Sequence, residues 1–280
     1  MAATSSFERA CCGCFRVETE RLRQSAMAPS SNANSECDEL VVFPLSRKHS
    51  PRGDIWRRHM TIPTITSLAP LLDRLFDQDE AARGAMRAAF ADVTDADRAR
   101  MMRSKTAYRD LYGRLKDAPL AVSRETGHLL YMLARSSRAK AIVEFGTSFG
   151  ISTLHLAAGL RDNGGGRLIT TEFEPSKAAR ARENLAAGGL LDLVEIREGD
   201  ALKMLRVDLP DTIDLVLLDG AKALYPDILD LVEGHLRPGA IIVADNADDS
   251  PDYLARMRRP GSGYMSTPFA EDVELSVRIN

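Results

Sequence analysis

The spacing of apolar residues changes along the chain. Between about residues 67 and 133, apolar side chains recur at i, i+3 and i+4, as in LAPLLDRLF and SRETGHLLYMLARS, which is the spacing of amphipathic helices. From residue 141 onward, short apolar runs alternate with helical patterns. These runs are AIVEF, RLITTE, LVEIRE, IDLVLLD and AIIVAD. The first pattern predicts a helical cap over residues 60–135, and the second predicts a separate domain over residues 136–280.

Alternating strands and helices indicate βαβ crossovers. They predict an α/β fold with a Rossmann-like, doubly wound sheet that is mostly parallel and has helices on both faces. Pro175 and the pair Gly188–Gly189 mark the start and the end of one of these helices. The last two runs, GYMST and EDVELSVRIN, lie too close together for a crossover helix. We therefore expect an antiparallel strand at the C-terminal edge of the sheet.

Residues 1–59 show neither pattern. They mix Ser, Asn, Arg and Pro and lack the apolar core of a secretory signal, so they predict a disordered N-terminal extension. One hypothesis is that translation naturally starts at Met60. All four cysteines lie in the first 37 residues, and the Cys11-Cys12-x-Cys14 cluster has no second ligand pair at zinc-finger spacing. An incidental reduced tail explains it better than a zinc site.

Composition narrows the possible partners. The chain has 280 residues, 44% of them hydrophobic, and a net charge of −3. It can bury a large core, but it offers no basic face for nucleic acid and no apolar run of about 18 residues for a membrane. We expect a cytoplasmic protein that acts on a small molecule.

The stretch AIVEFGTSFGISTLHLA runs from a strand through a glycine turn into a helix. Such a turn places free backbone N–H groups at the edge of a sheet, where they can face a nucleotide-like ligand. Its spacing, G-x-x-x-G after an acid, differs from the G-x-G-x-x-G of dinucleotide sites. The turn alone is weak evidence, because many such turns only connect a strand to a helix.

Acidic residues end most of the predicted strands, at the edge where doubly wound sheets bind ligands. Glu172 follows Gly150 at about the 20-residue offset of an acid that binds ribose hydroxyls. Asp200, in EGDAL, could reach an adenine edge or could cap the next helix, and the sequence leaves both open.

Asp219 and the pair Asp245–Asn246 end two predicted strands that should be neighbours, about 4.8 Å apart. Two carboxylates and an amide oxygen form the oxygen ligand set that Mg²⁺ prefers. Each residue singly could instead be a turn former. Their shared edge favours a divalent cation.

Five segments carry a resemblance to a known family. VEFGTSFGIST, LITTEFEPSKAARARENL, EGDAL, IDLVLLDGAK and GAIIVADNAD, in this order, resemble the motifs of class I S-adenosylmethionine-dependent O-methyltransferases. The resemblance is to the cation-dependent group that includes the catechol and caffeoyl-CoA O-methyltransferases. It covers about residues 115–280, and the pairing of DGAK with DN is its most specific part.

The resemblance implies S-adenosylmethionine and a divalent cation, with Mg²⁺ favoured. It implies that the cation is held by Asp219, Asp245 and Asn246, and that Lys222 is a catalytic base beside a catalytic Asp219. A nearby cation and desolvation would both lower the lysine pKa. The implied cofactor-binding residues are Glu144, Gly146, Thr147, Ser152, Glu172, Asp200 and Ala201. A homodimer through the helical cap is a hypothesis by analogy.

Two departures limit what the resemblance implies. Ala221 stands where many relatives have an acid, so one usual cofactor contact is missing. The chain between Asn246 and the final strands is short, so the wall of the acceptor site cannot be mapped. The expected activity is O-methylation of a small phenolic or catechol-like molecule. The alternatives are a metal-independent methyltransferase, a cofactor-binding protein without catalysis and, less favoured, an NAD(P)-dependent oxidoreductase.

Overall fold

A computed structural model describes residues 62–270 and 272–280. The predicted N-terminal extension, with its cysteines and Met60, lies outside the described residues. Everything described belongs to one compact unit, His59–Asn280. The predicted boundary between residues 135 and 136 falls inside this unit, at the end of a helix that packs against the sheet domain.

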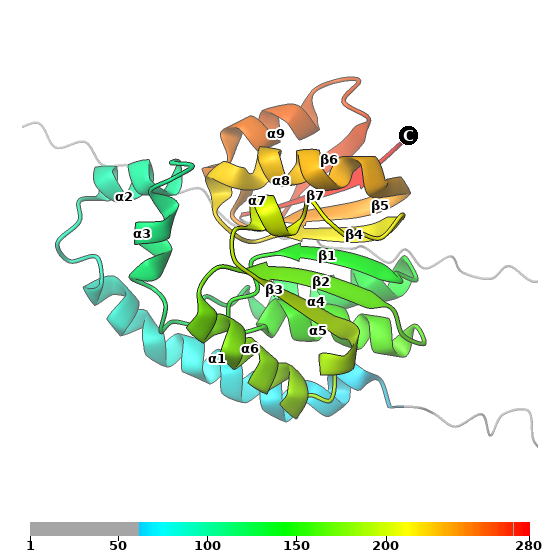
Figure 1. The fold of residues 1–280 in the computed structure, drawn as a ribbon, viewed down its shortest axis with the longest axis horizontal. Helices are drawn as coiled ribbons and strands as arrows, with labels where there is room; N and C mark the ends of the chain where they lie inside the picture. The colour runs from blue at the N-terminus through cyan, green and yellow to red at the C-terminus, as the bar shows by residue number, and fades with distance from the viewer. Residues whose placement is uncertain (1–61, 271) are drawn as a thin grey trace, which may run out of the picture. The chain divides into compact units, whose positions relative to one another are not determined.

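A seven-stranded sheet forms the centre of the unit, in the order β3-β2-β1-β4-β5-β7-β6 (Figure 1). The first five strands are parallel, and β7 runs antiparallel to both β5 and β6. The prediction of a doubly wound sheet with an antiparallel C-terminal edge is confirmed. The strands are β1 (Ala141–Phe145), β2 (Arg167–Glu172), β3 (Val194–Glu198), β4 (Ile213–Leu218), β5 (Leu236–Ala244), β6 (Tyr264–Phe269) and β7 (Val273–Arg278).

The strand order reverses between β1 and β4. The chain passes from β1 outward to β2 and β3 and then returns to the other side of β1 as β4 and β5. The connection that follows β1 therefore runs toward β2, and the connection that follows β4 runs the other way, toward β5. Because these two connections diverge, a crevice opens at the carboxyl ends of β1 and β4. Apolar residues predominate in β1 and β4, because both faces of these central strands are covered by helices; Glu144 and Asp214 are the exceptions.

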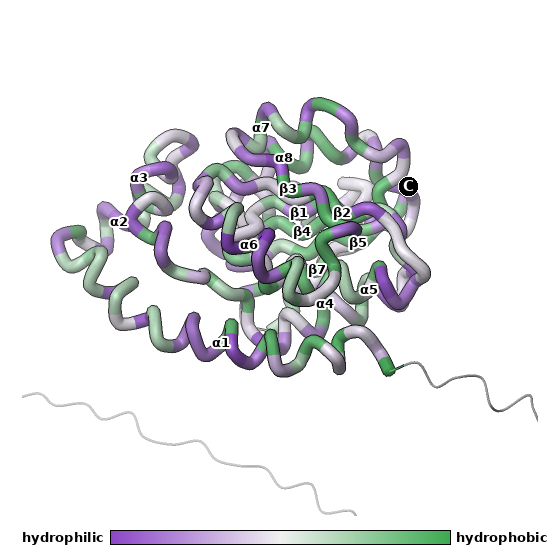
Figure 2. The backbone as a smooth tube through the Cα atoms, turned by 60° about the horizontal axis from the view of Figure 1, so that its bottom comes forward, coloured by the Kyte–Doolittle hydropathy of each residue, from purple (hydrophilic) through white to green (hydrophobic). Residues whose placement is uncertain are grey.

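Helices cover both faces of the sheet (Figure 1). One face carries α4, α5 and α6, and the other carries α7, α8 and α9. Figure 2 shows hydrophobic segments gathered around the sheet and hydrophilic residues along α1 and α6. The helices on the two faces are α4 (Arg124–Ser136), α5 (Ile151–Asp162), α6 (Pro175–Ala187), α7 (Ala201–Met204), α8 (Tyr225–Val232) and α9 (Pro251–Arg258). Four short 3₁₀ helices join them: η1 (Leu191–Leu193), η2 (Lys222–Leu224), η3 (Glu233–His235) and η4 (Ala247–Asp249).

The helices before β1 divide into two groups. The long helix α1 (Thr64–Ala88) packs against α5 through Leu68, Leu71, Leu72 and Leu75, so it extends the layer that α4 and α5 form on the sheet. The short helices α2 (Asp95–Met102) and α3 (Tyr108–Gly113) lie at the other end of α1 and reach the crevice. Across the described ranges, the helices are all too short or too polar to span a bilayer.

α4 and α5 approach each other closely at Gly127. A Cβ placed there would lie 2.7 Å from the His155 ring of α5, so the position accepts only glycine without movement of that ring. The His155 ring is 1% exposed, and its Nδ1 lies 2.8 Å from the Ile151 carbonyl oxygen. Burial lowers the pKa of His155 to about 4.

Candidate active site

A cavity of about 310 Å³ lies at the carboxyl ends of β1, β2, β4 and β5. It has two sides. The β2 side is lined by Ser148, Glu172, Phe173, Glu174 and Lys177. The β5 side is lined by Asp219, Lys222, Asp245, Asn246 and Asp272. Gly146 of the predicted glycine turn lies between them.

The glycine turn brings two strands together. Gly146 has φ +103° and Gly150 has φ +82°, which are conformations that glycine adopts without strain. A Cβ on Gly146 would lie 2.5 Å from the Asp219 carbonyl oxygen, because the turn runs directly against the end of β4. Gly146 therefore allows the close approach of the turn to the end of β4, whereas a Cβ on Gly150 would meet Ala181 of α6 at 3.3 Å.

The prediction of free N–H groups does not hold for the first three residues of this turn. The amides of Gly146 and Thr147 both donate to the Thr171 carbonyl oxygen, at 3.3 and 3.1 Å. The Ser148 amide donates to Glu172 at 2.8 Å. These bonds fasten the turn to the end of β2 and hold the Glu172 carboxylate in place.

Glu144, Thr147 and Ser152 lie behind the turn and do not line the cavity. The Glu144 carboxylate is completely buried and accepts 2.6 Å hydrogen bonds from Ser152 and Thr153. Burial raises the pKa of Glu144 to about 7, although these hydrogen bonds oppose the shift. The three residues were predicted to bind the cofactor. Their side chains hydrogen-bond to one another and to Thr170. They therefore support the turn from the side that faces away from the cavity.

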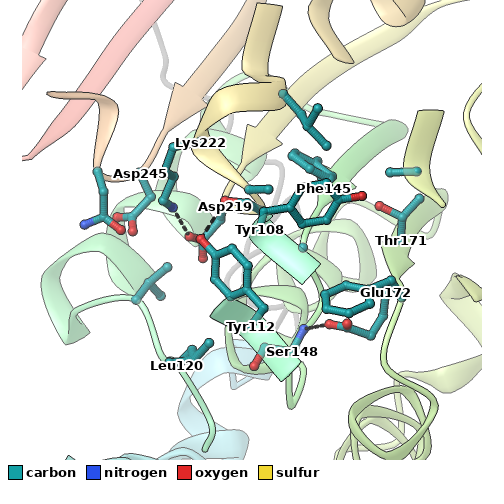
Figure 3. Close-up of a pocket in the computed structure, with 18 of the residues that line it drawn as sticks. Tyr108, Tyr112, Leu120, Phe145, Ser148, Thr171, Glu172, Asp219, Lys222 and Asp245 are labelled. Atoms are coloured by element: carbon teal, nitrogen blue, oxygen red, sulfur yellow. Dashed lines mark hydrogen bonds and ion pairs between the residues drawn. The ribbon is translucent and has the colours of Figure 1, made fainter. Parts of the chain in front are cut away.

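Glu172 reaches the cavity as predicted. One carboxylate oxygen accepts from the Ser148 amide at 2.8 Å, and the other accepts from the Glu174 amide at 2.9 Å (Figure 3). Burial raises the pKa of Glu172, while both amides and Lys177 oppose that rise. Each oxygen still has a lone pair that can accept a ligand hydroxyl.

Lys177 is a cavity residue that the sequence reasoning missed. It lies on α6 and is only 4% exposed, with Nζ 3.3 Å from the Ser148 hydroxyl. Burial lowers the pKa of Lys177 to about 8, although the negative charges of Glu172 and Glu174 oppose this shift. Its spacing to Ala181 and Leu185 on the buried stripe of α6 was the available signal.

Asp200 and Ala201 have different surroundings in the structure. Ala201 lines the cavity and Asp200 does not. One Asp200 oxygen caps α7 by accepting from the Leu202 amide at 3.0 Å, and the other lies 3.4 Å from Arg109 of α3. Asp200 is therefore a helix cap, which is one of the two alternatives that the sequence left open.

Asp219, Asp245 and Asn246 all line the β5 side, and we call them the acid centre. Their strands are in register at Leu218 and Ala244, so the residues that follow emerge side by side. The Asn246 amide nitrogen donates to Asp272, a further carboxylate at 2.9 Å. Burial, and next the charge of Asp219, raise the pKa of Asp245 to about 8.

The acid centre is a hard oxygen donor set that fits a divalent cation, because such an ion would relieve the repulsion between its two carboxylates. No group of three or more His, Cys, Asp or Glu side chains positioned for a metal occurs within the described part of the chain. The fit therefore depends on the amide oxygen of Asn246 as the third protein donor.

Lys222 is nearly buried, 4% exposed, and its Nζ lies 3.0 Å from an Asp219 carboxylate oxygen (Figure 3). Burial alone would lower the lysine pKa, but Tyr225 and the carboxylate of Asp219 outweigh it and raise that pKa well above its ordinary value. The predicted lowering of the Lys222 pKa depended on burial and on a nearby cation. Burial acts in the predicted direction, and the effect of a cation stays a prediction.

Two tyrosines of α3 also line the cavity, and the sequence reasoning missed both. Tyr108 packs edge-on to Phe173, with ring centroids 6.1 Å apart. The Tyr112 hydroxyl lies 3.4 Å from the Gly220 carbonyl oxygen and points toward Lys222 and Asp219 (Figure 3). Their spacing of one helical turn places both on the face of α3 that meets the crevice.

Comparison with known proteins agrees with this architecture. A family model described as a methyltransferase domain matches residues 143–247. The chain is 38% identical over 130 residues to the catechol O-methyltransferase of Niastella koreensis, and the matched region covers 45% of this chain and 58% of that protein. It is 32% identical over 173 residues to the catechol O-methyltransferase of Sus scrofa, covering 59% of this chain and 91% of that protein.

The chain thus spans just over half the length of the Niastella relative and most of the Sus scrofa one. Among solved structures, a methyltransferase from Geobacter sulfurreducens superposes with a TM-score of 0.51 at 26% identity, covering 62% of this chain and 88% of that chain.

Proposed function

The chain belongs to the class I S-adenosylmethionine-dependent O-methyltransferase family that includes the catechol O-methyltransferases, and from this membership we propose that it methylates a hydroxyl of a small phenolic molecule. S-adenosylmethionine is the proposed methyl donor. The acceptor that we favour is a catechol-like molecule, bound with the help of a divalent cation.

The β2 side of the cavity supports binding of the methyl donor. The Glu172 carboxylate is held in one orientation by two backbone amides, which prepares it to accept ribose hydroxyls. Thr171 keeps a buried hydroxyl that has no partner among the described residues. Phe173 offers an aromatic face at the same side. A nucleoside presents the hydroxyls and the flat base that this set can bind.

The β5 side supports chelation of the acceptor. Asp219, Asp245 and Asn246 would hold the cation, which supplies a positive charge that orients two neighbouring acceptor oxygens and makes their protons easier to lose. Two vicinal hydroxyls on one ring suit such a site, because both oxygens can lie on one side of the ion. This geometry favours a catechol over a lone phenol.

In the proposed reaction, an oxygen of the acceptor forms a bond to the donor methyl carbon as the bond from that carbon to sulfur breaks. The bonding electrons stay on sulfur, and the products are the methyl ether and S-adenosylhomocysteine. The hydroxyl proton would pass to Lys222 Nζ, after the ammonium has left Asp219 and given its own proton to solvent water. Positioning of the two reactants in one cavity supplies much of the rate.

One observation carries the proposal. The anchored Glu172 carboxylate and the acid centre open into a single cavity, and Gly146 keeps the floor between them free of a side chain. A donor bound at one side and an acceptor bound at the other would meet there.

The test is methyl transfer from labelled S-adenosylmethionine to a panel of catechols and phenols, with Mg²⁺ and with excess EDTA. We expect labelled ether products that disappear with EDTA and return with Mg²⁺ or Mn²⁺. Full activity in EDTA, with metal content verified as negligible, would favour a metal-independent methyltransferase. Binding of S-adenosylhomocysteine without transfer to any acceptor would favour a cofactor-binding protein. A rise in melting temperature with NAD(P)H alone would favour an oxidoreductase.

A further inference from the structure

The wall of the β5 side comes from the helices before the sheet. The segment after Asn246 is too short to build it, and no residue of α9 lines the cavity. Tyr112 of α3 lines this side instead, with its hydroxyl near Lys222 and Asp219. Met102 of α2 and Leu120 of the segment after α3 also line the cavity, and Tyr108 lines it where it packs against Phe173. The part of the chain that covers the acceptor site therefore lies far before the acid centre in the sequence.

Tyr112 is the member of this wall whose hydroxyl lies beside the acid centre. The hydroxyl lies 3.4 Å from the Gly220 carbonyl oxygen, and the residue as a whole is partly exposed. Burial raises the pKa of the Tyr112 phenol, and the charged groups that face it are Lys222, Asp219, Asp249 and Asp245. In Figure 3 the ring stands between Leu120 on one side and the pair of Lys222 and Asp219 on the other.

We propose that Tyr112 determines the size of the acceptor that the cavity admits. This inference rests on the proposed function, because it assumes that the acceptor binds at the acid centre. A ring chelated there through two oxygens must extend away from Asp219 and Asp245, and Tyr112 stands across that space. A single ring needs little depth beyond the ion, whereas a second fused ring would collide with the Tyr112 side chain.

Three contacts keep α3 in this position. The Tyr108 ring is 7% exposed and packs at 6.1 Å against Phe173, one turn before Tyr112. Arg109 lies 3.4 Å from Asp200. Lys105, just before the helix, pairs with Asp227 at 2.5 Å. The two ion pairs are partly exposed, so each stabilises little on its own. Together with the buried Tyr108 ring, they make withdrawal of Tyr112 costly.

The experiment compares two acceptors of equal chemistry and unequal size, catechol and 2,3-dihydroxynaphthalene. We expect Tyr112→Ala to raise the ratio of kcat/KM for the naphthalenediol to that for catechol by roughly tenfold or more, mainly through KM. Tyr112→Phe is the matched control, since it keeps the ring and removes only the hydroxyl. Its ratio should stay within about twofold of wild type, because the proposed selection depends on volume.

Tyr112→Leu provides a second variant if alanine at this position prevents folding. Circular dichroism and binding of S-adenosylhomocysteine would verify the fold of each variant. An unchanged ratio in folded variants with smaller side chains would overturn the inference while leaving the proposed function intact. Failure of the wild-type protein to methylate or to bind either diol, with Mg²⁺ present, would reject the proposed function and this inference with it.

Discussion

Glu172 and Asp245 are both buried carboxylates at the ends of parallel strands, with exposed fractions of 7% and 8%, yet their surroundings differ. Each Glu172 oxygen already accepts a backbone N–H. Asp245 instead faces the like charge of Asp219, which adds to burial in raising its pKa. The β2 side is thus organised before a ligand arrives, whereas the β5 side holds repulsion that a bound cation would relieve.

This difference indicates separate roles for the two sides. A carboxylate fixed by amides gives binding affinity and orientation to a neutral hydroxyl ligand. The two close carboxylates Asp219 and Asp245 have one ammonium, Lys222, beside them, so a negative charge remains that a bound cation would neutralise. Changes on the β2 side should therefore act on donor binding, and changes on the β5 side should act on turnover.

The largest expected effects are on turnover, and Asp245→Asn should produce one of them. Turnover should fall on the order of one hundredfold or more, because one charged donor of the acid centre becomes neutral and acceptor alignment is lost. Calorimetry should find an S-adenosylhomocysteine dissociation constant close to that of wild type. Asp252→Asn, an exposed residue of α9 with the same charge change, is the control. A variant that lost donor binding together with turnover would contradict the separation of the two sides.

Lys222→Met should lower kcat by about 10²–10⁴-fold, the usual contribution of a general base. Donor affinity should change little, since Lys222 contacts Asp219 and not the β2 side. Lys203→Met removes an exposed lysine of α7 and controls for the charge. Lys222→Arg keeps a cation that cannot act as a base near neutral pH. Near-normal turnover in the folded arginine variant would mean that Lys222 serves only as the counter-ion of Asp219.

Gly146→Ala tests the contact that joins the two sides. An alanine at φ +103° would carry a Cβ 2.5 Å from the Asp219 carbonyl oxygen, so the end of β4 must move. Gly165→Ala is the matched control, because Gly165 has φ +93° but no atom within 4 Å of a Cβ. Both variants should lose roughly 1–2 kcal/mol of unfolding free energy for the backbone conformation. Gly146→Ala should lose clearly more in urea unfolding, and equal losses would argue against a tight contact.

Glu172→Ala should weaken S-adenosylmethionine binding by roughly 1–3 kcal/mol, because the ribose hydroxyls would lose a charged acceptor. Titration calorimetry measures the change. Glu198→Ala is the control, since Glu198 pairs with Glu172 in the strand register but does not line the cavity. An unchanged dissociation constant in folded Glu172→Ala would mean that the donor does not bind at the end of β2.

The smallest expected effect lies outside the cavity, at His155. Its pKa falls from 6.5 to about 4 on folding, so the unfolded chain binds more protons between these values and stability is lost as the pH falls through this window. Between pH 7 and pH 5.5, His155 should contribute a loss of about 1 kcal/mol. This loss is measured in urea unfolding as the difference between wild type and His155→Gln, because the raised pKa values of Glu144 and Asp245 act in the opposite direction. As the pH falls through this window, wild type should lose stability relative to His155→Gln. Stability curves of wild type and variant that run parallel would contradict the contribution of His155.

Local patterns in the sequence predicted most of the fold. The runs AIVEF and RLITTE coincide with β1 and β2, because continuous apolar runs of this length suit strands covered on both faces. The glycines and prolines that bound α6 acted as expected. The same patterns predicted that Glu172, Asp219 and Asp245 would meet at one edge, since parallel strands deliver their ends together.

Side-chain direction was beyond the sequence. Glu144 and Glu172 both lie at strand ends, yet Glu144 turns inward to Ser152 and Thr153 while Glu172 faces the cavity. The two faces of a strand alternate, but which face borders the cavity depends on how the turn folds over it. That fold was set by bonds from the turn to the end of β2, which no spacing rule predicts.

The sequence by itself determined the order of strands and helices, the acids at the strand ends and the family resemblance, because these depend on local periodicity and short motifs. The tertiary structure alone decided that Lys177, Tyr108 and Tyr112 line the cavity, that Asp200 caps a helix and that Asp219 holds the Lys222 proton. These outcomes depend on contacts between segments far apart in the chain. Burial and charge at such contacts follow from packing, which local sequence does not encode.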